Sequence, residues 1–294
     1  MITTDLTAAD RAFSIRLRRF LDKPWPEKWR SVRFRWGRLF RWLPRPVRLP
    51  FGALWLDWPD TISTAVTGGE FEGAEIGFVE RLIRPGMTVL DIGSHHGLYT
   101  LLASRRTGAN GRVVAFEPSQ RERRKLRLHL RLNRAENVHV EPVALGAEAG
   151  EASFYRVDGD ETGCNSLRPP AVQAPVSALR VKVARLDDYA DALPKVDFVK
   201  MDVEGAELDV LRGAQRLLGR RPRPLWLVEV SDLRTGPWGY RARRILEFLE
   251  ERGYQWFDVF DAGRLRPMAG PREHLDNNFV AVPEERLEEV AESL

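Results

Sequence analysis

The sequence predicts an α/β fold built on a mostly parallel sheet. Five short runs rich in β-branched and other apolar residues end in polar or turn residues: MTVLDIG, RVVAFEP, VHVEPVAL, VDFVKMDVEG and LWLVEVSD. Helical patterns separate most of these runs, at residues 98–105, 121–134 and 206–218. Continuous apolar strands that alternate with helices are typical of a parallel sheet covered on both faces.

The remaining elements of this domain are a hairpin and a C-terminal β-rich segment. Between the third and fourth strands, residues 152–189 predict a hairpin with a polar, proline-containing loop. After a helix at 242–252, YQWFDVFDAGRLRPM predicts a strand, a DAG turn and a strand, and NNFVAVP predicts a last strand before an acidic terminal helix. We therefore place one domain at residues 61–294.

The segment before it, residues 1–60, is predicted to be a basic, aromatic-rich helical extension. Its first 48 residues hold 13 of the 46 Lys and Arg but only 4 of the 42 Asp and Glu. Residues 13–21 and 29–43 place apolar side chains at helical spacing. Two interpretations stay open: the helices pack on the main domain as a cover, or they lie on an anionic membrane surface.

Composition excludes several classes of protein. Cys164 is the single cysteine, so neither a disulfide within the chain nor a cysteine-based zinc site can form. No apolar stretch approaches the ~18–20 residues that span a bilayer, and the first residues do not resemble a signal peptide. We expect a cytoplasmic protein, with peripheral contact at the inner membrane face as the open alternative. The main body is net acidic, which argues against nucleic acid as a partner.

The loop VLDIGSHHGLYT predicts a cofactor pocket at the end of the first strand. Its glycines, Gly93 and Gly97, form G-x-x-x-G rather than the G-x-G-x-x-G that approaches a pyrophosphate. This difference favours S-adenosylmethionine, which carries a sulfonium, an amino-acid head and an adenosine. Asp91 would hold the loop and the cationic amino end, and Glu117, at the end of the next strand, would accept hydrogen bonds from both ribose hydroxyls.

The adjacent His95 and His96 predict no metal site. Neighbouring residues at a helix start are expected to point in different directions, and two histidines without a third ligand are weak evidence for a metal. His96 is kept as a proton acceptor facing the pocket, because an imidazole titrates near neutral pH. The alternative is a packed or solvated histidine.

Acidic residues also end the fourth and fifth strands. Asp202 and Glu204 lie two positions apart, so strand alternation would send both carboxylates to one cleft if the strand persists. There they would orient or deprotonate a substrate hydroxyl. The structural alternative is that Glu204 favours a helix N-terminus and Asp202 braces the loop. For Glu229, in LVEV, a functional and a structural interpretation stay open in the same way as for Glu204.

Together, VLDIGSHHGLYT, AFEPS, NVHVEPVALG and VKMDVEGAELDVLRGA closely resemble the FkbM family of S-adenosylmethionine-dependent methyltransferases, over roughly residues 60–282. The resemblance implies a class I methyltransferase fold: a Rossmann-like, seven-stranded, mostly parallel sheet with an antiparallel last strand. It also implies O-methylation of sugars, polysaccharides, lipids or natural products. Many members have Ala-Asn where this chain has Ser94-His95.

The family's functional residues carry over onto matching positions. The implied cofactor-binding residues are Asp91, Gly93, Ser94 and Gly97 in the loop, Glu117 at the ribose, Ala144 and Leu145 at the adenine, and Asp202. The implied catalytic residues are Asp202 and Glu204, with His96 as the further candidate from the loop itself.

The sequence thus predicts an S-adenosylmethionine-dependent O-methyltransferase whose acceptor carries a hydroxyl on a sugar, polysaccharide, glycolipid or natural product. The alternative is a non-catalytic cofactor-binding or membrane-surface module. A nicotinamide-dependent reductase is disfavoured by the missing G-x-G-x-x-G. The loop RVDGDETGCNSLRPP and the hairpin FDVFDAGRLRPM are expected to shape the acceptor pocket, because variable loops on a fixed scaffold set specificity. The oligomeric state stays open.

Overall fold

The computed structural model describes residues 44–294 except 160, 271 and 291–294. The chain divides into two compact units, Met1–Arg45 and Pro46–Leu294, and the second is described below. The two amphipathic helices expected at 13–21 and 29–43 lie outside the described residues, and the domain boundary after residue 60 stays a prediction. Among the described helices, none is long and apolar enough to cross a bilayer.

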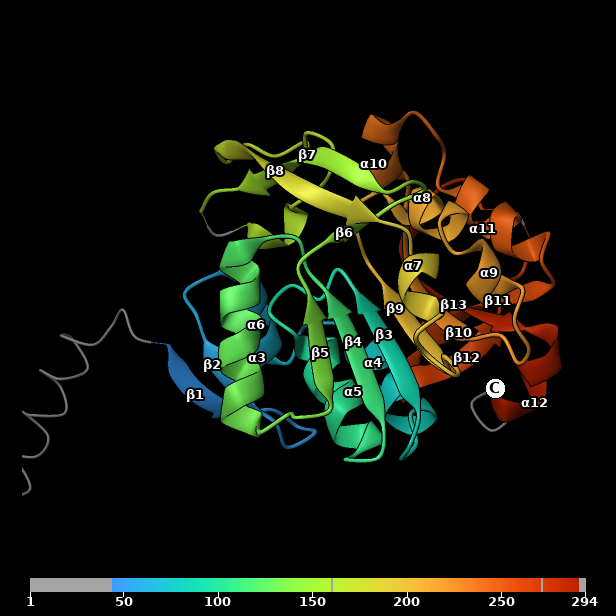
Figure 1. Cartoon of the computed structure of the whole chain (residues 1–294), viewed down its shortest axis with the longest axis horizontal. Coiled ribbons are helices and arrows are strands. Elements are labelled where there is room, and N and C mark those ends of the chain that lie inside the picture. Colours follow the sequence, from blue (N-terminus) through green and yellow to red (C-terminus); the bar gives the residue numbers. More distant parts are fainter. Residues whose placement is uncertain (1–43, 160, 271, 291–294) are drawn as a thin grey trace, which may run out of the picture. The chain divides into compact units, whose positions relative to one another are not determined.

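An eight-stranded sheet forms the centre of this unit, in the order β12-β11-β13-β10-β9-β3-β4-β5 (Figure 1). Strands β5, β4, β3, β9 and β10 are mutually parallel, whereas β13 pairs antiparallel with both β10 and β11. The bounds are β3 Thr88–Ile92, β4 Arg112–Phe116, β5 Val138–Glu141, β9 Phe198–Met201, β10 Leu225–Ser231, β11 Tyr254–Phe260, β12 Arg264–Pro267 and β13 Asp276–Pro283. The predicted mostly parallel sheet with an antiparallel last strand is confirmed, and β12 adds one strand beyond the seven expected.

Helices cover both faces, as the continuous apolar strands predict. Successive strand residues point to opposite faces, so Val89 packs with α4 (Gly73–Leu82) and α5 (Leu98–Thr107), while Leu90 packs with the other layer. That layer comprises α7 (Asp187–Ala190), α8 (Glu207–Arg212), α9 (Gln215–Leu218) and α11 (Arg243–Glu250). The other helices are α3 (Thr61–Gly68), α6 (Gln120–Asn133), α10 (Asp232–Thr235) and α12 (Leu287–Val290).

Two predicted elements are broken in the structure. The helix expected at 206–218 is the pair α8 and α9, because Gly213 lies so close to the backbone of another loop that an added Cβ would approach the Gly146 oxygen to 2.1 Å. The run VHVEPVAL forms two strands, β5 in the main sheet and β6 (Ala144–Leu145) in a second sheet. Pro142 separates them, since proline supplies no backbone N–H to a ladder.

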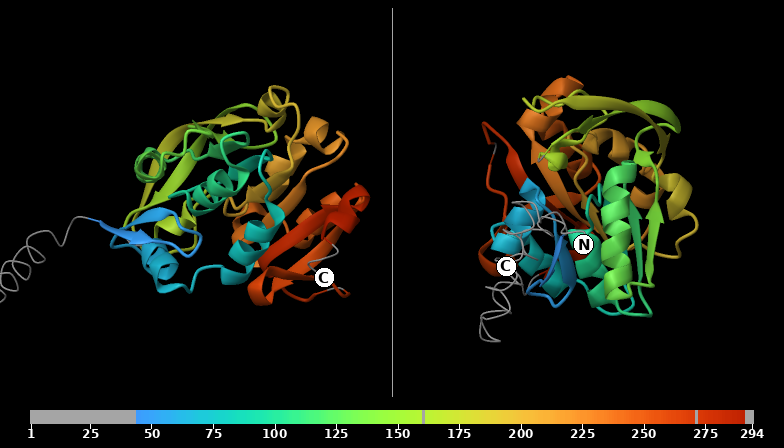
Figure 2. Two further views of the ribbon diagram at one scale, coloured as in Figure 1. Left: turned by 90° about the horizontal axis from the view of Figure 1, so that it is seen from below. Right: turned by 90° about the vertical axis from the view of Figure 1, so that its left-hand side faces the viewer.

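The second sheet has the order β6-β8-β7 and contains the predicted hairpin. Its arms, β7 (Gly150–Val157) and β8 (Val176–Ala184), pair antiparallel along their length. The hairpin lies above the carboxyl ends of β3, β4 and β5 (Figure 1, Figure 2). Helix α12 lies toward the opposite side of the unit. Its loop, which includes the short helix η1 (Thr162–Cys164), reaches over the place where those strands end.

A two-stranded sheet, β1 (Arg45–Arg48) and β2 (Leu54–Asp57), packs its second strand on α6. The fully buried Trp55 stacks on His129 of α6, with ring centroids 4.1 Å apart. His129 Nε2 accepts from the Leu56 N–H at 3.0 Å, so its Nδ1 carries the proton and donates to the His96 carbonyl at 2.7 Å. This buried histidine therefore ties β2 to the loop after β3.

We predict that Trp55→Ala lowers the free energy of unfolding by about 3–5 kcal/mol, because it opens a cavity and removes the stack on His129. Urea unfolding followed by circular dichroism measures the change. Leu233→Ala is the control, since Leu233 is 63% exposed and its loss should cost under about 0.5 kcal/mol. Equal stability of the two variants would contradict the tie between β2 and the pocket loop.

Candidate active site

A cavity of about 430 Å³ opens at the carboxyl ends of β3, β4, β9 and β10, beneath the β7–β8 hairpin loop. This is where open α/β sheets bind ligands. Every predicted site residue lines it: Asp91, Gly93, Ser94, His96, Gly97, Glu117, Ala144, Leu145, Asp202 and Glu204. The structure thus brings together in one cavity residues that the sequence placed at separate strand ends.

The loop after β3 takes its shape from left-handed backbone at Gly93, His95 and Gly97, with φ of 82°, 47° and 90°. A Cβ at Gly93 would lie 1.8 Å from the Asp202 carbonyl oxygen, and one at Gly97 would lie 2.3 Å from Leu126 Cδ1. Close packing on backbone therefore requires glycine at position 93, and the left-handed backbone favours it at position 97. Their predicted contact with a cofactor stays a prediction.

Two buried carboxyls stand at this end of the cavity. Thr100 Oγ1 donates to Asp91 Oδ2, and burial raises the pKa of Asp91 to about 6. Glu117 accepts from the backbone N–H of His95 at 2.9 Å and of Ser119 at 2.7 Å, one on each oxygen. Burial raises the pKa of Glu117 to about 8. Each oxygen of Glu117 keeps a second lone pair, so the side chain can still accept two hydroxyl donors.

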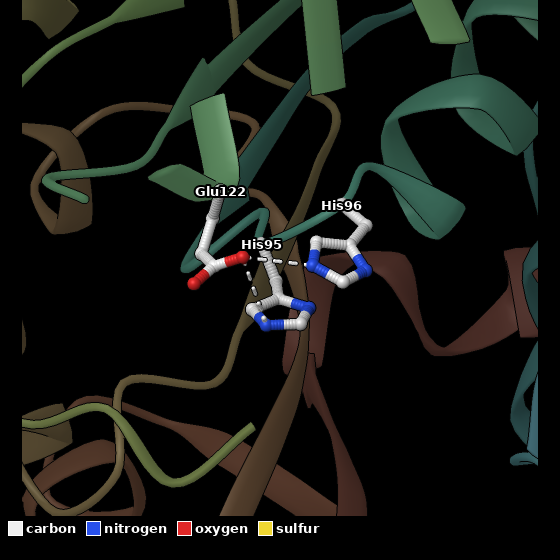
Figure 3. Close-up of side chains that lie close together, drawn as sticks. All are labelled: His95, His96 and Glu122. Carbon is white, nitrogen blue, oxygen red and sulfur yellow. Dashed lines mark hydrogen bonds and ion pairs between the residues drawn. The ribbon is translucent and has the colours of Figure 1, made fainter. Parts of the chain in front are cut away.

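The two histidines do not point in different directions, so that expectation is wrong. The left-handed backbone at His95 turns its ring onto His96, and the rings stack with centroids 3.8 Å apart (Figure 3). His96 Nε2 lies 2.8 Å from Glu122 Oε2, and His95 Nε2 lies 3.9 Å from the same oxygen. Two rings stacked face to face cannot both direct an in-plane lone pair at one ion, so we assign no metal to this cluster.

His96 is 1% exposed, and burial lowers its pKa below the usual range. A neutral His96 then donates from Nε2 to an ionised Glu122. Burial opposes ionisation of Glu122, but this hydrogen bond and the Arg121 guanidinium, 2.6 Å away, hold its pKa at about 2. His96 borders the cavity while it is engaged with Glu122, and its role as a proton acceptor stays a prediction.

Three carboxylates form an acidic trio at the other end of the cavity: Asp202, Glu204 and Glu229, each with an oxygen within 4.8 Å of the others. The sequence suggested that a persisting strand would direct Asp202 and Glu204 to one cleft, but the strand does not persist. Instead β9 ends at Met201, and left-handed backbone at Glu204 (φ 56°) turns its carboxylate back to the cavity. The turn before α8 is held by Glu207, which accepts from the Val203 and Gly205 N–H groups.

Two members of the trio hold their protons more tightly than ordinary carboxyls. Burial, and then the charge of Asp202, raise the pKa of Glu204 and of Glu229 well above the usual range. Arg234 Nε lies 2.9 Å from Glu204 Oε2, and Lys200 Nζ lies 3.7 Å from Asp202 Oδ2. Because these two cations already offset part of the negative charge, we assign no metal to the trio.

Lys200, Asn278 and Glu72 belong to the site but escaped the sequence analysis. Lys200 Nζ donates to Asn278 Oδ1 at 2.8 Å, and Asn278 Nδ2 donates to Glu72 Oε1 at 3.0 Å. Glu72 is 206 positions away from Asn278, so no local pattern joins them. Lys200 could have been noticed, because a lysine between Val199 and Met201 in an apolar strand is unusual.

The hairpin FDVFDAGRLRPM was expected to shape the acceptor pocket, and this is wrong for the residues described. None of its residues lines the cavity. The strands β11 and β12 lie at the opposite edge of the sheet from β4 and β5, and their DAG turn packs on Gly77 of α4. The other expected loop does contribute, through Cys164, Asn165 and Leu167.

The strand order and the strand-end cavity define a class I methyltransferase fold. Residues 91–256 match the model of the methyltransferase FkbM domain, which is more than half of the chain. The chain belongs to the FkbM methyltransferase family, as the resemblance implied.

Two curated relatives are similar over parts of the chain. The AMB antimetabolite synthetase AmbE of Pseudomonas aeruginosa is 30% identical over 210 residues, covering 59% of this chain and 10% of the relative. Methyltransferase 1 of Beauveria bassiana is 29% identical over 143 residues, covering 42% of this chain and 57% of the relative. This chain therefore spans a tenth and just over half of the length of these relatives.

An O-methyltransferase from Bacillus cereus, in complex with SAH, is 15% identical with a TM-score of 0.43, covering 71% of this chain and 80% of that one. Fibrillarin from Aeropyrum pernix, with natively bound S-adenosyl-L-methionine, is 19% identical with a TM-score of 0.41, covering 81% and 82%.

We predict that S-adenosylhomocysteine binds more tightly as the pH rises from 6 to 9. Ribose hydroxyls would donate to the ionised form of Glu117, whose pKa is raised to about 8, so binding at low pH would first expel a proton. Glu117→Gln should weaken binding about tenfold or more and remove this pH dependence. Calorimetric titration measures both.

Glu141→Gln is the matched control, because this half-buried carboxylate pairs with His139 outside the cavity lining. The Glu117 assignment would be wrong if Glu117→Gln and Glu141→Gln bound S-adenosylhomocysteine with the same pH dependence.

Proposed function

We propose that this chain is an S-adenosylmethionine-dependent methyltransferase that methylates a hydroxyl on a sugar, polysaccharide, glycolipid or natural product. The observation that carries the proposal is the continuity of the cavity, which runs from Glu117 and Asp91 to the acidic trio. One end offers acceptors for a nucleoside and an amino group, and the other offers acceptors for a hydroxyl proton. The two ends suit a donor and an acceptor of a methyl group held side by side.

The cofactor is S-adenosylmethionine, and the residues present fit it. Glu117 would hold the ribose, Asp91 the loop and the cationic amino end, and the buried Ala144 and Leu145 would border the adenine. When bound, the cofactor supplies a methyl group on a sulfonium, which leaves as the neutral thioether of S-adenosylhomocysteine. The chain positions the two partners and takes up the proton of the acceptor hydroxyl.

Asp202 is our first choice for the group that orients the hydroxyl or accepts its proton. Its side chain is 31% exposed, whereas Glu204 is held by Arg234 at 2.9 Å. Glu204 and His96 follow as further candidates for this catalytic role. The excess of carboxylates at this end repels an anionic acceptor, so the charge favours a neutral polyol.

We predict that Asp202→Asn keeps S-adenosylhomocysteine binding but lowers turnover by about 100-fold or more, the usual contribution of a general base. Turnover is measured as S-adenosylhomocysteine formation with a panel of neutral sugars and polyols, uronic acids, sugar phosphates and amines. Asp209→Asn is the control, since Asp209 pairs with Arg212 in α8 and does not line the cavity.

Each result of this assay has a definite meaning. Methylation of neutral polyols supports the proposed acceptor class, whereas methylation of amines alone would replace it. Unchanged turnover in Asp202→Asn would remove Asp202 from the mechanism. Cofactor binding without turnover on any acceptor of the panel would favour the non-catalytic module.

A peripheral membrane role for the basic N-terminal extension stays a second proposal. An exposed basic face on α6 favours it: Arg124, Arg127 and Arg131 have no ion-pair partner among the described residues, and Leu128 beside them is 41% exposed. Arginines with exposed leucines suit the headgroup region of an anionic bilayer.

We predict that the full chain co-sediments with vesicles containing phosphatidylglycerol but not with pure phosphatidylcholine vesicles, and that deletion of residues 1–43 weakens this binding at least about tenfold. Equal pelleting with both vesicle types would contradict an electrostatic membrane contact.

A further inference from the structure

Lys200 occupies an unusual position, an ammonium buried among carboxylates. It lies on β9 between Val199 and Met201, which pack with the α8–α9–α11 layer, so alternation directs Lys200 to the α4–α5 face. The same face of the neighbouring strands carries Asp91, which is paired in register with Lys200, and Glu229, which is paired with Asn278. A polar row therefore crosses four strands, near the carboxyl ends of β3, β9 and β10 and near the amino end of the antiparallel β13, with Lys200 as its cation.

The partners of Lys200 do not use all of its N–H donors, and the remaining donors are directed at the cavity. An ammonium has three N–H donors. Within hydrogen-bond distance among the described residues, Lys200 Nζ meets Asn278 Oδ1 at 2.8 Å, while the Tyr99 ring centroid lies 5.2 Å away. Asp202 Oδ2 stands further off, at 3.7 Å, and Lys200 itself lines the cavity. The ammonium thus acts on the acidic trio through its charge at close range.

We propose that Lys200 is a positioning residue for methyl transfer: its positive charge keeps the acidic trio from taking up protons on all three carboxylates, so that an ionised oxygen remains to receive the proton of the acceptor hydroxyl. This inference rests on the proposed function. In the step, the acceptor oxygen bonds to the methyl carbon as the carbon–sulfur bond breaks, the bonding electrons leave on sulfur, and the hydroxyl proton passes to the trio. Lys200 stays protonated throughout.

The charge balance explains why the counter-charge is needed. The groups that face Lys200 and the trio come from every element packed against them: Glu72 and Glu75 at α4, Asp91 on β3, Tyr99 on α5, Cys164 on η1, Asp202, Glu204 and Glu207 at the β9–α8 turn, Glu229 on β10 and Arg234 on α10. Carboxylates outnumber the two cations, so without Lys200 the cluster would recover neutrality by binding protons.

The electrostatics of Lys200 agree with this role. Burial alone would lower the pKa of its ammonium, but the charges of Glu72, Asp202 and Glu229 outweigh burial and raise it. Conversely, the charge of Lys200 lowers the pKa of Glu204 and Glu229 against the stronger effects that raise it. Removing the cation therefore raises the pKa of Glu204 and Glu229 further and favours their protonated forms.

The first test is an NMR titration of the full chain labelled with ¹³C at the Asp and Glu carboxyls. Resonances of the trio are assigned by their loss in Asp202→Asn, Glu204→Gln and Glu229→Gln. We expect Lys200→Gln to raise the pH at which the trio loses its protons by about one unit, and Lys200→Arg, which keeps the charge, to leave it near the wild-type value. Coinciding titrations of wild type and Lys200→Gln would overturn the proposal.

A measurement on the wild type covers the case in which Lys200→Gln does not fold. The ¹⁵Nζ shift of Lys200, assigned by its loss in Lys200→Arg, reports whether the side chain is an ammonium. It should remain charged at pH 7, and a neutral Lys200 amine would also overturn the proposal.

Neither experiment contains cofactor or acceptor. They can therefore fail while the methyltransferase assay succeeds, or succeed while it fails.

With an acceptor identified by the panel, the pH profile of turnover separates this role from a structural one. Lys200→Gln should lose about tenfold in turnover at pH 6.5 and recover most of it by pH 9, as expected for a shift of about one unit. A structural defect would lower turnover equally at all pH values, which would overturn the proposal. In a protein that already carries Asp202→Asn, adding Lys200→Gln should lower turnover only slightly further, because the group through which Lys200 acts is gone.

Discussion

The constraint on which the site depends is the burial of charge at the carboxyl ends of the strands. Lys200 is 3% exposed, and an unpaired ammonium at that depth would cost several kcal/mol. Its partners are drawn from distant parts of the chain, Asn278 from β13 and Glu72 from the start of α4. The antiparallel β13 is therefore more than an extra strand, since its insertion beside β10 brings an amide within reach of the lysine.

The same constraint explains the tight loop geometry around the cavity. A buried carboxylate needs donors, and backbone N–H groups become donors only where the chain turns sharply. Glu117 receives two such groups, one of them from His95 in its left-handed conformation. Gly93 meanwhile lets the loop after β3 pack against the Asp202 carbonyl. Thus the turn that donates to Glu117 also touches Asp202, which begins the acidic trio.

The sequence predicted the fold and the lining of the cavity near Asp91 and Glu117 well because their signals are local. A strand is a few consecutive apolar residues, and the acid or glycine that ends it is adjacent in the chain. That is why Asp91 and Glu117 could be placed beside one another before the structure was known. Hairpin β7–β8 and helix α6 were predicted for the same reason, since each is defined by its own pattern.

The acceptor end was harder to predict because it depends on contacts between distant residues and on backbone angles that the sequence does not display. Nothing in the chain announces that Glu204 takes φ of 56°, or that His95 takes 47° and stacks on its neighbour. In the sequence, nothing distinguishes Glu72 from the other acidic residues of its segment. Its importance appears only when α4 is seen beside β13, which accounts for the missed lysine partner.

An excess of negative charge in the cavity links cofactor binding to the chemistry that follows. S-adenosylmethionine carries a sulfonium that S-adenosylhomocysteine lacks, so the negative charge of the trio, which Lys200 and Arg234 offset only in part, favours the charged donor over its product. When the methyl group leaves, that positive charge disappears from the cavity while a proton arrives at the trio. The local charge is thereby conserved across the reaction. A site that takes up a proton as it loses the sulfonium charge needs an ionised carboxylate to receive that proton. In our proposal, the Lys200 ammonium keeps such a carboxylate ionised until the methyl group is transferred.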